Sequence, residues 1–191
     1  MMKFRWAAAV AVAFLISACS TPMKPEDFQG NEPRFVPEQY FSGETKAWGI
    51  FEDRFGNLRR QFVVDITGTW DGGVLVLDER FAYSDGEKDR RVWTIRKIDD
   101  NHYSGTAGDV IGTAAGKSYG NALNWAYDMN LKVGDDTWKV SFDDWMFLQP
   151  GDVLLNRAVV TKFGFHIGTV TLSFSKPAAV ANANTLRRAA E

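Results

Sequence analysis

Cysteine is almost absent from this sequence, because the 191 residues contain a single one, Cys19. No disulfide bond can form within the chain, and a site built from several thiolates is excluded. Histidine is nearly as rare. His102 follows a predicted turn and His166 lies in a predicted strand, so neither is marked as a catalytic base. We therefore predict no catalytic residues, no metal site and no cofactor, and an enzyme is the less favoured class of protein.

The N-terminal hydrophobic run is too short to cross a membrane. Residues 6–16 carry no charge, whereas a membrane-spanning helix needs about 20 apolar residues. Lys3 and Arg5 precede this run, and a cationic start followed by a short apolar segment is typical of a secretory signal peptide.

The segment Leu15-Ile16-Ser17-Ala18-Cys19 resembles the bacterial lipobox, in which an aliphatic residue and two small residues precede an obligatory cysteine. Its thiolate accepts a lipid, small flanking residues let the signal peptidase reach the bond after Ala18, and a multiply acylated cysteine anchors a protein stably. We predict lipidation, and hence a membrane anchor, at Cys19. Ser20 follows in place of the aspartate that retains lipoproteins in the inner membrane, which favours the outer membrane facing the periplasm. The alternatives are an ordinary signal peptide with an incidental cysteine, or a buried start of the fold.

A basic excess is lacking, since 22 lysines and arginines are opposed by 24 aspartates and glutamates. Cleavage would also remove Lys3 and Arg5. Nucleic acids attract basic surfaces, so we predict no nucleic-acid partner.

Four of the six prolines lie between Cys19 and Phe41, where they disfavour a helix and hold the chain extended. The predicted organisation is a signal peptide (1–18), a lipid-anchored linker (19–41), a β-barrel domain (42–176) and a C-terminal tail (177–191).

Apolar and polar side chains alternate through most of the domain, which is the period of a β-strand. The clearest run is residues 122–133, and residues 62–70, 138–142 and 170–174 repeat the pattern. Turn-forming residues separate such runs about every dozen residues. We predict an all-β, antiparallel up-and-down barrel of about nine to ten strands, because closure removes exposed sheet edges. A β-sandwich is the alternative. A transmembrane barrel is disfavoured by short, charged strands.

The polar residues most suggestive of a binding site surround the end of one predicted strand. Asp143, Asp144 and Trp145 are followed about a dozen residues later by Asn156 and Arg157. Across a hairpin, an aspartate and Arg157 could form a bidentate ion pair. Such a pair either closes one end of the barrel or binds the polar group of a ligand.

Tryptophan is abundant, with seven residues in the chain. An aromatic interior is either filled or lines a lumen for an apolar ligand, and the sequence leaves both readings open. We include Trp70 and Trp125 with the polar residues above in the predicted ligand-binding set.

A set of short segments is shared with one bacterial family: Trp48-Gly49-Ile50-Phe51, Asp53-Arg54, Asp89-Arg90-Arg91-Val92-Trp93, Gly120-Asn121-Ala122-Leu123, Asp143-Asp144-Trp145-Met146 and Asn156-Arg157. Together, from about Phe41 to Lys176, they resemble the uncharacterised family DUF3833. The resemblance implies a lipocalin-like, calycin-type barrel in a lipoprotein of the cell envelope, with a role in handling lipid. It implies no catalytic residues, because none is established for that family.

The favoured hypothesis is an outer-membrane-anchored periplasmic lipoprotein that binds or shuttles a hydrophobic ligand such as a fatty acid or lipid. A structural or interaction protein of the envelope with a filled barrel core is the second. An enzyme acting on envelope lipid, with Asp143, Asp144 and Arg157 as its polar centre, is the third.

Overall fold

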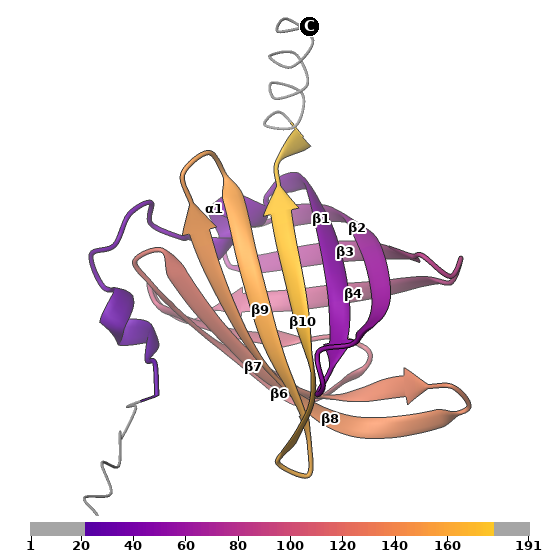
Figure 1. The fold of residues 1–191 in the computed structure, drawn as a ribbon. Coiled ribbons are helices and arrows are strands. Elements are labelled where there is room, and N and C mark those ends of the chain that lie inside the picture. Colours follow the sequence, from indigo (N-terminus) through magenta and orange to yellow (C-terminus); the bar gives the residue numbers. More distant parts are fainter. Residues whose placement is uncertain (1–21, 178–191) are drawn as a thin grey trace, which may run out of the picture.

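Ten β-strands make up most of the structure, a computed structural model that describes residues 22–177 (Figure 1). Each strand pairs antiparallel with its neighbour in sequence, and β1 also pairs with β10, so the sheet closes into a barrel. This confirms the predicted all-β barrel and its strand number, and the β-sandwich alternative is wrong. The strands are β1 (Gly43–Asp53), β2 (Leu58–Trp70), β3 (Val74–Tyr83), β4 (Lys88–Lys97), β5 (His102–Thr106), β6 (Val110–Tyr119), β7 (Ala122–Val133), β8 (Asp136–Gln149), β9 (Val153–Lys162) and β10 (Phe165–Ser175).

The alternation of side chains decides which residues face the barrel interior. Along β7, Leu123, Trp125 and Met129 are buried, whereas Asn130 and Lys132 are exposed. The same period of two continues across the hairpin to β8, whose register with β7 is unbroken over their whole paired length. A shift of one residue would expose the whole apolar set, so the hydrophobic pattern itself fixes the register.

The segment before the barrel is folded, in contrast to the extended linker predicted for residues 19–41. Within its described part, Pro25–Phe28 form a 3-10 helix and Pro37–Phe41 form the short helix α1. Both helices have proline in their first turn, where the missing N–H costs no hydrogen bond, so these prolines start helices instead of disrupting them. Phe35, Tyr40 and Phe41 are buried in the barrel core.

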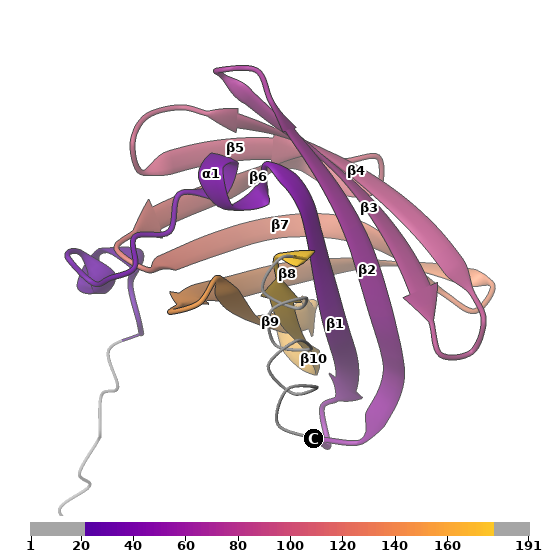
Figure 2. The same ribbon diagram turned by 90° about the horizontal axis from the view of Figure 1, so that it is seen from above.

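Hydrogen bonds attach this segment to several strand ends. The Phe35 N–H donates to the Gly120 carbonyl at 2.7 Å, and the Ser118 hydroxyl donates to the Phe35 carbonyl at 2.7 Å. The Tyr40 hydroxyl donates to the Asp152 carbonyl at 3.0 Å. Seen from above, α1 therefore lies across one end of the barrel, which we call the closed end (Figure 2).

Glu38 in α1 is a buried carboxylate with two specific partners. Lys97 Nζ lies 2.7 Å from Oε1, and the Tyr103 hydroxyl donates to Oε2 at 2.9 Å. Burial raises the pKa of Glu38, but the hydrogen bonds from Lys97, the backbone and Tyr103, together with the charge of Lys97, outweigh it and the pKa is lowered. The charged form of Glu38 thus ties α1 to β4 and β5.

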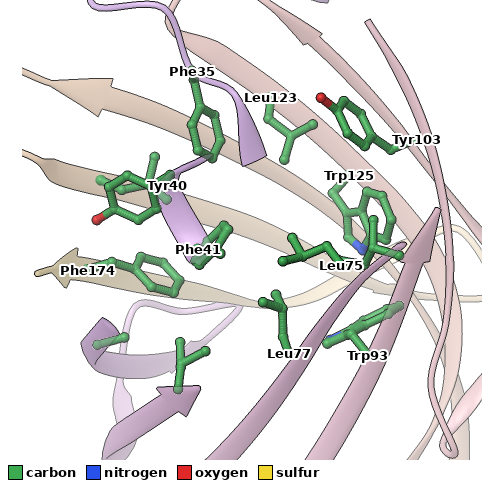
Figure 3. Packing of buried hydrophobic residues seen from close by; sticks show 14 of the residues in the cluster. Phe35, Tyr40, Phe41, Leu75, Leu77, Trp93, Tyr103, Leu123, Trp125 and Phe174 are labelled. Atoms are coloured by element: carbon green, nitrogen blue, oxygen red, sulfur yellow. The ribbon is translucent and has the colours of Figure 1, made fainter. Parts of the chain in front are cut away.

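The largest apolar cluster fills the closed end around α1 (Figure 3). Gly68 in β2 allows the close approach of α1, because a Cβ atom there would overlap the carbonyl oxygen of Phe41. None of the helices within residues 22–177 is long and apolar enough to span a membrane. The predicted signal peptide, Cys19 and the tail beyond Pro177 lie outside the described residues.

Candidate ligand-binding cavity

A cavity of about 450 Å³ occupies the barrel interior. Its volume falls within the range of small-molecule sites, which are concave and mostly apolar with a few polar groups. Pro37 and Phe41 of the N-terminal segment line it at the closed end. Arg59, Lys132 and Gly134 line it near the turns at the opposite end, which we call the open end.

Exposed aromatic residues gather on two neighbouring turns at the open end. Phe55 follows β1 and is 74% exposed, while Phe163 and Phe165 flank the β9–β10 turn and are 87% and 75% exposed. The two turns are joined by a hydrogen bond from the Arg54 N–H to the Ile167 carbonyl at 3.1 Å. Exposed apolar patches of this kind mark contact with apolar surfaces or ligands.

Aromatic side chains form one wall of the cavity. Trp93 packs edge-on against Trp125 and Tyr127, with ring centroids 5.5 and 5.2 Å apart. Trp125 lies over Gly105 and Gly116, where a Cβ atom would overlap its indole ring. Trp125, which the sequence analysis placed in the ligand-binding set, therefore lines the cavity. Trp70 was placed in the same set, but its side chain is partly buried against the largest apolar cluster and does not line the cavity.

A group of polar side chains interrupts the apolar lining, and we call it the polar centre. Glu79 on β3 and Arg91 on β4 are directly paired across the two strands. Tyr127, Asp144 and Asn156 come from β7, β8 and β9, and all five residues line the cavity. Arg91 forms an ion pair with Asp109 through both Nε and Nη2, and the shortest N–O distance is 2.7 Å.

Both carboxyl groups of the polar centre are shifted towards their neutral forms. Burial raises the pKa of Asp144 to about 7, although Asn156, Tyr127 and Arg91 favour its charged form. Burial raises the pKa of Glu79 to about 7 against the attraction of Arg91, and the negative charges of Asp109 and Asp144 add to the rise. Burial also raises the pKa of Tyr127, so its hydroxyl remains a hydrogen-bond donor.

The predicted polar set is split between the two faces of the barrel wall. Asp144 and Asn156 point inward, whereas Asp143 and Arg157 are exposed on the outer face. Adjacent strand residues point to opposite sides, which separates Arg157 from Asp144. Asp143 shares the outer face with Arg157, but Arg157 is paired with Trp145, two residues further along β8. Within residues 22–177, the predicted ion pair between Arg157 and an aspartate is not formed. The arginine beside Asp144 in the polar centre is Arg91, whereas Arg59 and Arg60 line the cavity from the start of β2.

The outward residues of the predicted set make local contacts. Asp143 accepts a hydrogen bond from Asn124 Nδ2 at 2.6 Å. Trp145 packs against Phe147 and against Phe28 of the 3-10 helix, with centroids 6.1 and 5.9 Å apart. Trp145 thus packs the N-terminal segment against the barrel wall, and both Asp143 and Trp145 are absent from the cavity lining.

Sequence reasoning missed Glu79, Arg91 and Tyr127. The signal was available, because Glu79 follows Leu75 and Leu77 on the inward face of β3. Arg91 likewise precedes Trp93 and Ile95 on the inward face of β4. A charged residue at the same alternate positions as the inward apolar residues of a strand shares their face, so its side chain also points into the barrel. Within residues 22–177, no group of three or more potential ligands could hold a metal ion.

A closed antiparallel barrel around an apolar, side-chain-lined lumen is a lipocalin-like fold. The chain belongs to the family described as "Protein of unknown function (DUF3833)", whose model matches residues 13–176. This confirms the resemblance seen in the sequence.

Among solved structures, the barrel is similar to that of the S-type phycobiliprotein lyase CPES from Guillardia theta. The TM-score is 0.52 at 10% sequence identity, covering 72% of this chain and 88% of that one. At this identity the likeness shows a shared fold. No curated protein matches the sequence.

Proposed function

We propose that this protein binds a hydrophobic small molecule, such as a lipid, within the barrel lumen. The cavity of about 450 Å³ between α1 and the open end carries the proposal. A purely structural or interaction protein, the alternative from sequence, would have its core filled. The lining combines aromatic and aliphatic side chains with one polar centre, which is the composition of a ligand site.

We further propose that Cys19 anchors the protein to the outer membrane on its periplasmic side. The lipobox and Ser20 support this anchor. The exposed Phe55, Phe163 and Phe165 at the open end would favour exchange of an apolar ligand with a neighbouring membrane, as a shuttle requires. A Cys19→Ser chain in which residues 1–18 are also replaced by an ordinary cleavable signal peptide should move from the membrane fraction to the soluble periplasmic fraction. Retention of this variant in the membrane fraction would count against the anchor.

Filling the lumen should abolish ligand binding. Val170 on β10 lines the cavity, while Thr171 beside it points outward and is exposed. We expect Val170→Trp to weaken binding of the neutral fluorescent probe N-phenyl-1-naphthylamine by about ten-fold or more, because its indole would occupy ligand space. Fluorescence titration measures this loss.

Thr171→Trp is the matched control, since it adds the same side chain to the outer face of the same strand. It should bind the probe as the wild type does. Equal probe binding by all three proteins, with folding verified by circular dichroism, would contradict a lumen site.

A further inference from the structure

The polar centre lies partway along the cavity, with apolar lining on both sides of it. On β3, Glu79 is flanked on the inward face by Leu77 and Phe81. On β8, Asp144 is flanked by Phe142 and Met146. A ligand that fills this cavity must therefore present a polar group inside the barrel, or leave buried polar groups without partners.

The hydrogen-bonding capacity that remains at the polar centre is mainly that of acceptors. Arg91 directs Nε and Nη2 at the Asp109 carboxylate, with distances of 2.9 and 2.7 Å to Oδ2. That ion pair neutralises the one cation of the centre. Asp144 is only 6% exposed, and neither it nor Glu79 forms an ion pair within residues 22–177.

A ligand carboxylate would add another negative charge to this site. It would face Glu79 and Asp144 in a cavity where burial strengthens repulsion between like charges. A protonated amine, an amide N–H or a hydroxyl would instead donate to these carboxyl oxygens, including those of Glu79, which accepts no hydrogen bond from another side chain within residues 22–177.

We propose that Glu79 and Asp144 make the lumen selective for long-chain ligands whose polar group donates hydrogen bonds, in preference to carboxylates such as fatty acids. This inference rests on the proposed ligand-binding function and specifies the chemistry of its ligand. The sequence suggested a fatty acid or a lipid as the ligand, and the present proposal disfavours fatty acids.

Three probes of equal chain length test the selectivity: dodecylamine, dodecanol and dodecanoate. Each is titrated at pH 7.5 against the protein loaded with N-phenyl-1-naphthylamine, and probe displacement is followed by fluorescence. We expect the amine and the alcohol to displace the probe at concentrations about ten-fold lower than dodecanoate. Displacement by dodecanoate at an equal or lower concentration would overturn the proposal.

Substitution of the two carboxyl groups tests whether they cause the selectivity. Glu79→Gln combined with Asp144→Asn should reduce the preference to about three-fold or less, and the outward Asp143→Asn should leave it unchanged. If the double variant does not fold, Asp144→Asn alone should reduce the preference in the same direction. A preference that survives removal of the carboxyl groups would refute their role. Failure of the wild type to bind the neutral probe would instead contradict the lumen site itself.

Discussion

Replacing Phe35 by alanine should lower the free energy of unfolding by about 3–5 kcal/mol, the usual cost of removing a fully buried aromatic side chain. Phe35 is 1% exposed and packs against Tyr40 and Phe41 with ring centroids 5.7 and 6.2 Å away. Its removal would leave a void at the closed end that these neighbours can fill only in part. Denaturant unfolding of both proteins, followed by tryptophan fluorescence, measures the change.

Met23 provides the control for this prediction. It lies in the same N-terminal segment but is 46% exposed, so Met23→Ala should change the free energy of unfolding by no more than about 0.5 kcal/mol. If Phe35→Ala is no more destabilising than Met23→Ala, the segment before β1 does not contribute to the barrel core.

The unfolding free energy of an Asp144→Asn variant should exceed that of the wild type at pH 8, and the difference should shrink towards pH 5. Burial raises the pKa of Asp144 from 3.8 to about 7 in the folded protein. The folded state therefore binds more protons than the unfolded state between these values, and wild-type stability falls as pH rises through about 7. Asparagine resembles the neutral acid and lacks this titration.

The expected growth of the stability difference between pH 5 and pH 8 is roughly 1–3 kcal/mol, since each pH unit of this window corresponds to at most about 1.4 kcal/mol. The charged or titratable side chains around Asp144 are Glu79, Arg91, Tyr127 and Asp143. Asp143→Asn, one residue away on the outer face, is the matched control: Asp143 raises the pKa of Asp144 less than burial does, so this variant should change the pH dependence far less than Asp144→Asn. A stability difference that does not vary with pH would show that Asp144 stays ionised in the folded protein.

The barrel was predictable because its strands are long and one face of each is buried. In residues 122–133 every second side chain is apolar, and the structure buries three of these fully (Leu123, Trp125 and Met129) and two partly (Tyr127 and Leu131), while Val133 at the end of β7 is exposed. The turns contain residues that accept the required backbone conformations, such as Gly56 and Gly86 with positive φ. Strand period and turn chemistry are local properties, so a single sequence records them.

The binding site was harder to predict because it depends on which face of its strand each residue occupies and on which side chains the opposite wall of the barrel places beside it. Asp144 and Asn156 were predicted together with Asp143 and Arg157, although the pleat separates these pairs. Asn156 and Tyr127 reach Asp144 from the neighbouring strands β9 and β7, but Arg91 comes from β4, far from Asp144 in the sequence. No local sequence pattern predicts that Arg91 lies near the carboxyl group of Asp144.

The N-terminal segment escaped prediction because proline was interpreted only as a helix breaker. Pro37 begins α1, and the aromatic residues Phe35, Tyr40 and Phe41 that follow the proline-rich stretch were the available sign of burial. The correction matters for function, since Phe41 forms part of the cavity lining. Without α1 the lumen would be open at both ends.

Native mass spectrometry, combined with extraction of bound small molecules, tests the central claim most directly. The Cys19→Ser chain with the ordinary cleavable signal peptide is purified from the periplasm without detergent, beside the same chain carrying Val170→Trp. We predict a small hydrophobic molecule bound to the first protein in stoichiometric amount and absent from the second. A Cys19→Ser protein that is folded, carries no such molecule and takes up none from added dodecylamine, dodecanol or dodecanoate would contradict a ligand-binding lumen.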